Sequence, residues 1–177
     1  DYDIFGWDGN VPEEHMENFL DAILVMNTAP RDDLEMNDFT VTADEIREQE
    51  KVMNAIGFES WQLVACRVSD GAWAGIHDVT WNPSDPDVVW VGATGVRPEH
   101  RGHALGKWLK AVMTLRVMDE RPNVTEIRTG NADSNDAMLG INKEMGYKPF
   151  ISQDVWELST DDAEVWLKSR GVELPSL

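Results

Sequence analysis

Three consecutive segments near the middle of the chain have the pattern of β-strands, and they constrain the fold more than any other feature. They cover residues 61–68, 72–81 and 87–96 and are separated by the turn sequences SDG and NPSDP. Strands that are rich in β-branched and aromatic residues and joined by such short turns pair antiparallel. The sequence therefore predicts a central sheet that is mostly antiparallel.

The segments on either side of this region alternate between helix and strand patterns. The second predicted helix begins at a capping box, Thr42-x-x-Glu45, and ends at Gly57. The predicted elements outside the three strands are a strand over 2–7, helices over 11–27 and 42–57, a helix over 102–119, a strand over 125–130, a helix over 133–145, a strand or hairpin over 147–159 and a short helix over 161–170. Their order predicts an α+β (mixed α/β) fold with one sheet and a single domain over 1–177.

The charge of the chain limits its partners. The formal net charge is -18, so nucleic acid and anionic membrane surfaces are not expected to bind, whereas a cationic ligand is attracted. A solvated acidic surface with no role in binding explains the same charge. No apolar run approaches the length of about 20 residues that a membrane span needs.

Cysteine and histidine usage gives further limits. The single Cys66 excludes an internal disulfide and fits a cytoplasmic protein, and the four histidines do not have the spacing of a metal site, so no metal is expected. The sequence begins at Asp1 without a methionine, which predicts a chain that is either trimmed or excised from a longer protein.

The stretch VRPEHRGHALGKWL, at 96–109, joins the end of a predicted strand to the start of a predicted helix. Five lysine or arginine residues lie between positions 97 and 116, against one acid, Glu99. The first amides of a helix have no intrahelical partner and bind anions, most often phosphate. Gly102 and Ala104 keep the turn small enough for a phosphate to approach the main chain. A plain strand-to-helix turn with a basic surface remains the alternative.

This stretch resembles the acyl-CoA-binding motif of the GNAT superfamily of N-acetyltransferases. The family pattern is Gln/Arg-x-x-Gly-x-Gly/Ala; Gly102 and Ala104 match it, and Glu99 departs from it. The stretch TGNADSNDAMLGINKEMGYKPF, at 129–150, resembles a second family signature, in which Asn131 and Asn135 are implied to contact the cofactor.

The resemblance implies a GNAT fold: a twisted, mostly antiparallel sheet, a V-shaped splay between two parallel strands, and helices on both faces. The acyl-CoA-binding core is then expected over 61–158, with 161–170 as an extra C-terminal helix. Acetyl-CoA is the implied co-substrate and a small amine the implied acceptor. The residues implied to hold the cofactor are Thr94, Val96, Arg101, Gly102, His103, Ala104, Leu105, Gly106, Lys107, Asn131 and Asn135.

A narrower resemblance is to the C-terminal halves of bacterial proteins with two tandem GNAT domains. Those halves carry W-x-G-x-x-P, M-N-x-A-P, H-R-G-H-x-L-G and N-A-x-S-N, and this chain has matching sequences at 7–12, 26–30, 100–106 and 131–135. The implied partner is a second GNAT domain in the full-length protein, with a homodimer as the alternative.

The catalytic groups are less well defined. His77 and Asp78 are the candidate bases on the central strand, and because neighbours on a strand face opposite ways, at most one points into the cleft. Many family members use a tyrosine as the acid for the leaving thiolate, but the matching position is Asn142, so the acid is unassigned. Tyr147 is interpreted as a core residue, and the tryptophans of the strands either pack in the core or line an acceptor pocket.

Three functional hypotheses follow. The first is an acetyl-CoA-dependent N-acetyltransferase that acts on a small, cationic amine. The second is a catalytically degenerate CoA-binding module with a structural or regulatory role in a tandem protein, which Asn142 and Glu99 favour. The third is transfer of a longer acyl group, or transfer to a hydroxyl.

Overall fold

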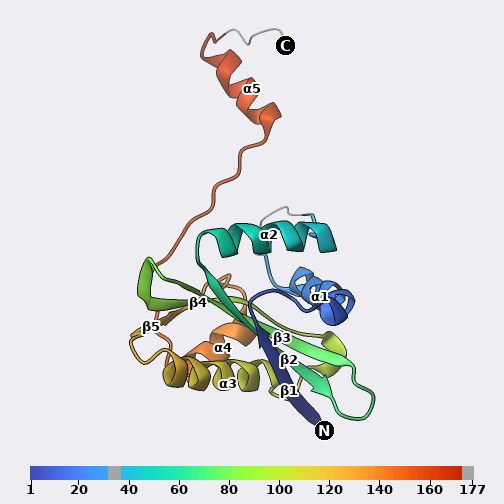
Figure 1. Cartoon of the computed structure of the whole chain (residues 1–177). Helices are drawn as coiled ribbons and strands as arrows, with labels where there is room; N and C mark the ends of the chain where they lie inside the picture. Colours follow the sequence, from blue (N-terminus) through green and yellow to red (C-terminus); the bar gives the residue numbers. More distant parts are fainter. Residues whose placement is uncertain (32–36, 173–177) are drawn as a thin grey trace. The chain divides into compact units, whose positions relative to one another are not determined.

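The computed structural model describes residues 1–31 and 37–172, and these divide into two compact units, 1–147 and 148–177. The first unit contains one five-stranded sheet with the strand order β1-β2-β3-β4-β5, flanked by helices (Figure 1). Its strands are β1 (Tyr2–Asp8), β2 (Glu59–Arg67), β3 (Trp73–Asn82), β4 (Asp85–Val96) and β5 (Glu126–Arg128). Its α-helices are α1 (Met16–Ile23), α2 (Ala43–Ala55), α3 (Leu105–Glu120) and α4 (Asp136–Glu144).

The sheet is mixed, as the sequence predicts. The first four strands pair antiparallel, and β4 and β5 pair parallel. The parallel pairing covers only Val88–Trp90 of β4, whereas β4 itself continues to Val96. From Val91 onward β4 therefore has no neighbouring strand on that side among residues 1–31 and 37–172, and the predicted splay between two parallel strands is confirmed.

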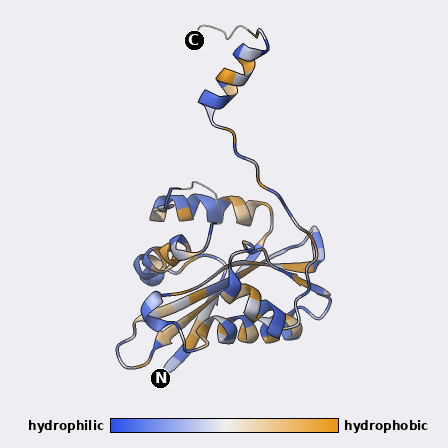
Figure 2. Ribbon diagram, turned by 180° about the vertical axis from the view of Figure 1, so that it is seen from behind, coloured by the Kyte–Doolittle hydropathy of each residue, from blue (hydrophilic) through white to orange (hydrophobic). Residues whose placement is uncertain are grey.

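Helices cover both faces of the sheet (Figure 1). On one face Leu109 and Met113 of α3 pack against inward-facing residues of β2, β3 and β4. On the other face Phe19 of α1 and Ile46 of α2 pack against Ile76 of β3. Figure 2 shows hydrophilic and hydrophobic residues mixed along these helices, as is expected when one side of each helix faces a core.

The N-terminal helical region is more broken than its sequence predicts. The predicted helix over 11–27 consists of a 3-10 helix at Glu13–His15, then α1, then a second 3-10 helix at Leu24–Thr28. The following helix, α2, begins as predicted. The Thr42 side chain accepts from the Glu45 amide, and the Glu45 carboxylate accepts from the Thr42 amide at 2.8 Å.

The second unit departs from the sequence prediction. The helix predicted over 161–170 is confirmed as α5 (Thr160–Ser169), but the strand or hairpin predicted over 147–159 is wrong, because residues 148–159 contain no strand. A strand needs a neighbour to satisfy its backbone groups, and the described part of this unit contains none. Apolar side chains of the segment are consequently exposed, and Trp156 is 90% exposed.

Among the described residues, no helix has both the length and the apolar character that crossing a membrane would require.

Candidate active site

The open edge of β4 is the first component of the site. The Arg97 amide donates to the Ala74 carbonyl at 2.9 Å, on the side of β3. Backbone groups alternate along a strand, so those of Val96 and Thr94 point the other way, into the splay. The Val96 carbonyl accepts from Arg101 Nε at 3.1 Å on that side. The two residues that the sequence assigns to backbone contacts with the cofactor therefore turn their main chain away from β3, and the Val96 carbonyl on that side is bonded to Arg101.

The turn between β4 and α3 is the second component. Gly102 and Ala104 both have positive φ, 83° and 57°, the left-handed region that glycine tolerates best. The first intrahelical bond of α3 runs from the Trp108 amide to the Ala104 carbonyl at 2.9 Å. The amides of Leu105, Gly106 and Lys107 precede it and have no place in the helical ladder. A Cβ on Gly102 would meet nothing within 4 Å, so a ligand can approach the turn directly.

The basic side chains near the turn have partners within the protein. The Arg101 guanidinium donates to Thr28 Oγ1 at 2.7 Å as well as to the Val96 carbonyl. Arg97 forms an ion pair with Asp21, and Lys107 pairs with Glu144 at 2.8 Å. Arg101 therefore connects the turn to the second 3-10 helix through hydrogen bonds. Because the basic side chains are paired, the free amides of the turn provide most of its capacity to bind an anion.

The two histidines of the turn contact the first strand. His100 is buried, and its Nδ1 lies 3.0 Å from the Tyr2 hydroxyl. The exposed His103 has its ring 5.4 Å from the Tyr2 ring. Both rings therefore help to hold the turn against β1.

The asparagines at and around α4 form the other side of the splay. The Asn135 side chain caps α4 by accepting from the Met138 amide at 3.2 Å. Asn142 is buried, and its Nδ2 donates to Asn131 Oδ1 at 2.7 Å. The Asn142 Oδ1 is buried and has no hydrogen-bond partner in the part of the chain that the structure describes. A neutral amide at this place holds Asn131 but has no acidic proton to give.

The two candidate bases lie on opposite faces of β3. His77 is buried on the α3 side, where its Nδ1 lies 2.8 Å from Thr94 Oγ1. Burial, together with the charge of Lys110, lowers the pKa of His77 to about 3. This imidazole is therefore neutral at physiological pH and occupied by the Thr94 hydroxyl.

Asp78 faces the α1 and α2 side and sits at a bulge in β4, where the register with β3 shifts between His77 and Val79. Its Oδ1 accepts from the Ala93 amide at 2.7 Å. A Cβ on Gly92 would lie 2.0 Å from Asp78 Oδ2, so only glycine leaves room for the carboxylate here. Burial raises the pKa of Asp78 to about 6. The carboxylate is ionised near neutral pH and is a stronger base than an exposed aspartate.

Trp90 lies on the same face of the sheet as Asp78. Its neighbours Val89 and Val91 pack toward α3, so the Trp90 side chain points the other way, and it is 46% exposed. Trp61 and Trp73, by contrast, are buried in the two cores. Of the alternatives that the sequence leaves open, Trp90 fits an accessible aromatic surface, and Trp61 and Trp73 are core residues.

Lys110 is a feature that sequence reasoning missed. It is 1% exposed, and its Nζ has no hydrogen-bond partner among residues 1–31 and 37–172. Burial lowers its pKa to about 8. Lys110 falls on the buried stripe formed by Gly106, Met113 and Val117, at spacings of three and four. A lysine at a position where the helical pattern places buried residues was the signal in the sequence that could have identified Lys110 as buried.

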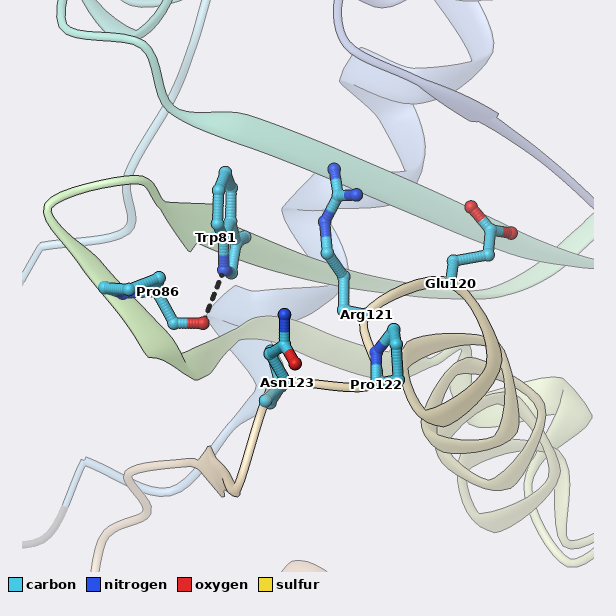
Figure 3. A pocket seen from close by; sticks show the side chains of 7 residues that line it. Trp81, Pro86, Glu120, Arg121, Pro122 and Asn123 are labelled. Carbon is cyan, nitrogen blue, oxygen red and sulfur yellow. Dashed lines mark hydrogen bonds between the residues drawn. The ribbon is translucent and has the colours of Figure 1, made fainter.

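A separate hollow of about 220 Å³ lies near the start of β5 and the end of α3 (Figure 3). The Trp81 Nε1 donates to the Pro86 carbonyl at 3.0 Å, and Arg121 lies over the Trp81 ring and pairs with Glu59. Arg121 Nε is buried without a hydrogen-bond partner among the described residues, and none of the predicted site residues lines this hollow. Within residues 1–31 and 37–172, no group of three or more acidic, histidine or cysteine side chains is placed to hold a metal ion.

Solved structures with this arrangement are acetyltransferases. A tandem GNAT protein from the clavulanic acid biosynthesis pathway superposes with a TM-score of 0.68 and 26% identity, over 84% of this chain and 42% of that one. AAC(6')-Iy, solved with the bisubstrate analogue CoA-S-monomethyl-acetylneamine, gives 0.61 and 14% over 90% and 99% of the two chains. Glucosamine-6-phosphate N-acetyltransferase from Arabidopsis thaliana gives 0.60 and 12% over 90% and 99%.

The chain is a GNAT-fold protein. No family model and no curated protein sequence matches it. This GNAT-fold chain spans less than half of the tandem protein, so the activity and partners of that whole protein do not transfer to it directly. The open β4 edge and the amide-lined turn fit the elongated, phosphate-bearing shape of an acyl-CoA.

Proposed function

We propose that the chain is an N-acetyltransferase that uses acetyl-CoA to acetylate a small, cationic amine. The observation that carries this proposal is the continuity of the unpaired β4 edge with the left-handed turn and the N-terminus of α3. A pantetheine arm can hydrogen-bond to the main chain of Thr94 and Val96 as an added strand. The pyrophosphate can then accept from amides between Gly102 and Gly106, while Asn131 and Asn135 border the other side.

Asp78 is the proposed base. The amine acceptor arrives protonated near neutral pH and must lose a proton before it attacks the thioester. The Asp78 carboxylate, with its pKa near 6, is ionised yet basic enough to take that proton, and the Ala93 amide fixes its position. His77 is excluded from this role because it lies on the opposite face, bonded to Thr94. Holding amine and thioester in line supplies a large further part of the rate.

Two features support a cationic acceptor. The chain carries a net charge of -18, which draws cations toward its surface. Trp90 has a partly exposed aromatic ring on the face of Asp78, and such rings attract cations. The Arg128 guanidinium already lies 5.7 Å from the centre of this ring, so an ammonium acceptor would share or displace that contact. The tandem neighbour supports a second GNAT domain as the proposed partner, and a homodimer is the alternative. The single Cys66 fits the proposed cytoplasmic setting.

The second candidate is a CoA-binding module without catalysis. It is favoured by Asn142, which occupies the position of the family's acid and is committed to Asn131. Binding of acetyl-CoA without transfer to any amine would support this module, and transfer of longer acyl groups or transfer to hydroxyls would redefine the substrates.

The decisive experiment measures acetyl-CoA binding by thermal shift and then CoA release with a panel of amines. A ligand at 100 times its Kd adds about 2.7 kcal/mol to stability. We call the free amides between Gly102 and Gly106 the amide cradle. Gly102→Glu is expected to abolish binding, because it places a carboxylate at this cradle, where the pyrophosphate would lie. Gly9→Glu is the matched control, since Gly9 also has positive φ, 71°, and open space around it. Equal binding by both variants contradicts the assignment of the turn.

A further inference from the structure

Lys110 differs from the other basic residues of its stretch. Arg97, Arg101, Lys107 and Arg116 each have a partner within the protein. Lys110 alone among these five is buried with an unpartnered ammonium group, as far as the described residues show. Burying an uncompensated charge lowers the stability of a protein. A buried and unpaired lysine therefore points to a functional role, such as contact with a ligand, rather than to a role in packing.

The surroundings of Lys110 do not neutralise it. Its Nζ lies 5.0 Å from the centre of the Tyr147 ring, and the electrostatic influence of Lys110 reaches His77 on β3. These are the titratable groups that face it, and both are neutral at physiological pH. On its own helix, Lys107 is exposed and paired with Glu144. In the described part of the chain no carboxylate forms an ion pair with Lys110.

The neighbours of Lys110 place it between the two sides of the splay. His77 is bonded to Thr94, at the open edge of β4. Tyr147 follows α4, and its amide donates to the Asn142 carbonyl at 2.9 Å. The ammonium thus lies between the β4 side and the α4 side, near the β4 edge along which the pantetheine arm is proposed to run. We place the acyl thioester at the end of that arm, in the same region.

We propose that Lys110 is the general acid that protonates the leaving sulfur of CoA. This role rests on the proposed acetyltransferase function. The acceptor ammonium first passes one proton through Asp78 to water and becomes a neutral amine. Its lone pair forms the new C–N bond, and the C–S bond breaks with its electron pair on sulfur. Lys110 gives one proton to that sulfur and becomes a neutral amine, while Asp78, ionised again, takes the second proton that the nitrogen loses as the amide forms. Both groups return to their starting state by exchange with water after the products leave.

The chemistry of the group agrees with this placement. A pKa of about 8 is close to that of an ordinary thiol, about 8.5, so the proton can pass between them without a large penalty. Asn142 has no acidic proton, and burial raises the pKa of Tyr147 above its usual value, which makes its hydroxyl a weaker acid.

The test compares wild type with Lys110→Met and with Lys51→Met, which removes an exposed lysine on α2. The first readout is the pKa of the thiol in bound CoA, which is measured from the ultraviolet absorbance of the thiolate. Wild type and Lys51→Met are expected to lower it below the value of free CoA, and Lys110→Met is not. The second readout is the affinity for CoA relative to that for desulfo-CoA, measured at pH 7 and at pH 8, where Lys110 is still partly charged. This ratio is expected to rise with pH only when Lys110 is present.

The third readout is turnover. Lys110→Met is expected to lower kcat by about 100-fold, the low end for a general acid, because a thiolate is already a good leaving group. Wild-type kcat is expected to fall as the pH rises through about 8, and the variant loses this limb. Lys110→Gln carries the same readouts if the Met variant does not fold.

An unchanged thiol pKa together with an unchanged kcat in Lys110→Met overturns the assignment. Equal loss of affinity for CoA and desulfo-CoA also overturns it, because the ammonium then contacts some other part of the ligand. If wild type neither binds acetyl-CoA nor transfers acetyl, the proposed function itself has failed. If wild type does both and the variant matches it, only the role of Lys110 has failed.

Discussion

His77 and Asp78 are neighbours on β3, yet their side chains lie in opposite surroundings. The His77 face is closed: the imidazole is bonded to Thr94, lies near a buried ammonium and has its pKa lowered to about 3. The Asp78 face is partly open: the carboxylate is bonded to one amide, lies near an exposed indole and has its pKa raised to about 6. Both shifts favour the neutral form, and both follow from burial. The sheet thus places the proposed acid and the proposed base on opposite faces.

The largest expected effect comes from removing the base. Asp78→Asn keeps the shape and an acceptor for the Ala93 amide, but it cannot take a proton. We expect kcat/KM to fall by about 100- to 10,000-fold. In wild type the rate is expected to decline as the pH falls through about 6, and in the variant that limb disappears. Asp85→Asn, at the exposed start of β4, is the control and keeps wild-type activity. Equal activity of both variants would remove Asp78 from the mechanism.

The closed face is tested through stability. Thr94→Val leaves a buried nitrogen of His77 without its partner and is expected to lower the free energy of unfolding by about 1–3 kcal/mol. Thr94→Ser retains a hydroxyl and is expected to lose less. Urea unfolding at pH 7 measures both. A Val variant as stable as the Ser variant would show that the His77–Thr94 bond contributes nothing.

The pH dependence of stability distinguishes the two faces. The pKa of Asp78 is higher in the folded state than in the unfolded state, so its contribution to stability declines as the pH rises from about 4 to about 6. Asp78→Asn should therefore gain stability over wild type by about 1–2 kcal/mol more at pH 7 than at pH 4. For His77 the sign is reversed, because its lowered pKa costs stability as the pH falls from about 6.5 toward 3. Parallel pH profiles for wild type and Asp78→Asn would contradict the raised pKa.

The smallest effect is expected at Trp90. Trp90→Leu removes the aromatic surface beside Asp78 while keeping an apolar side chain. KM for a cationic amine should rise by about two- to fivefold, with kcat nearly unchanged, because an exposed cation–π contact is worth about 0.5–1 kcal/mol. KM for an uncharged amine of similar size should not change. An equal rise in KM for both amines would show that Trp90 acts through packing.

Local signals predicted most of the fold. The capping box at Thr42 and Glu45, the turns between β2, β3 and β4, and the glycine turn before α3 depend on neighbouring residues, and each appears where the sequence places it. The segment around Trp156 has an equally strong strand pattern but no strand forms there, because pairing depends on a partner that the pattern does not encode.

The site was predictable only in its main-chain part. Gly102 and Ala104 predicted the turn, because a turn that a phosphate can approach requires small residues at these positions. Which of His77 and Asp78 faces the open side depended on the bulge in β4, which a strand pattern does not reveal. Lys110 looked like one more surface charge, and only the packing of α3 against the sheet shows that it is enclosed.

The contacts that hold the turn at 97–104 in place have a consequence for how the protein folds. Tyr2 and His100 are 98 positions apart, Arg97 and Asp21 are 76 apart, and Arg101 and Thr28 are 73 apart. Contacts between such distant positions close large loops and form slowly. The amide cradle therefore reaches its native shape only after the first strand and first helix have docked. During refolding, the native turn should therefore form later than the helical signal, and the proposed acyl-CoA binding should return with the turn.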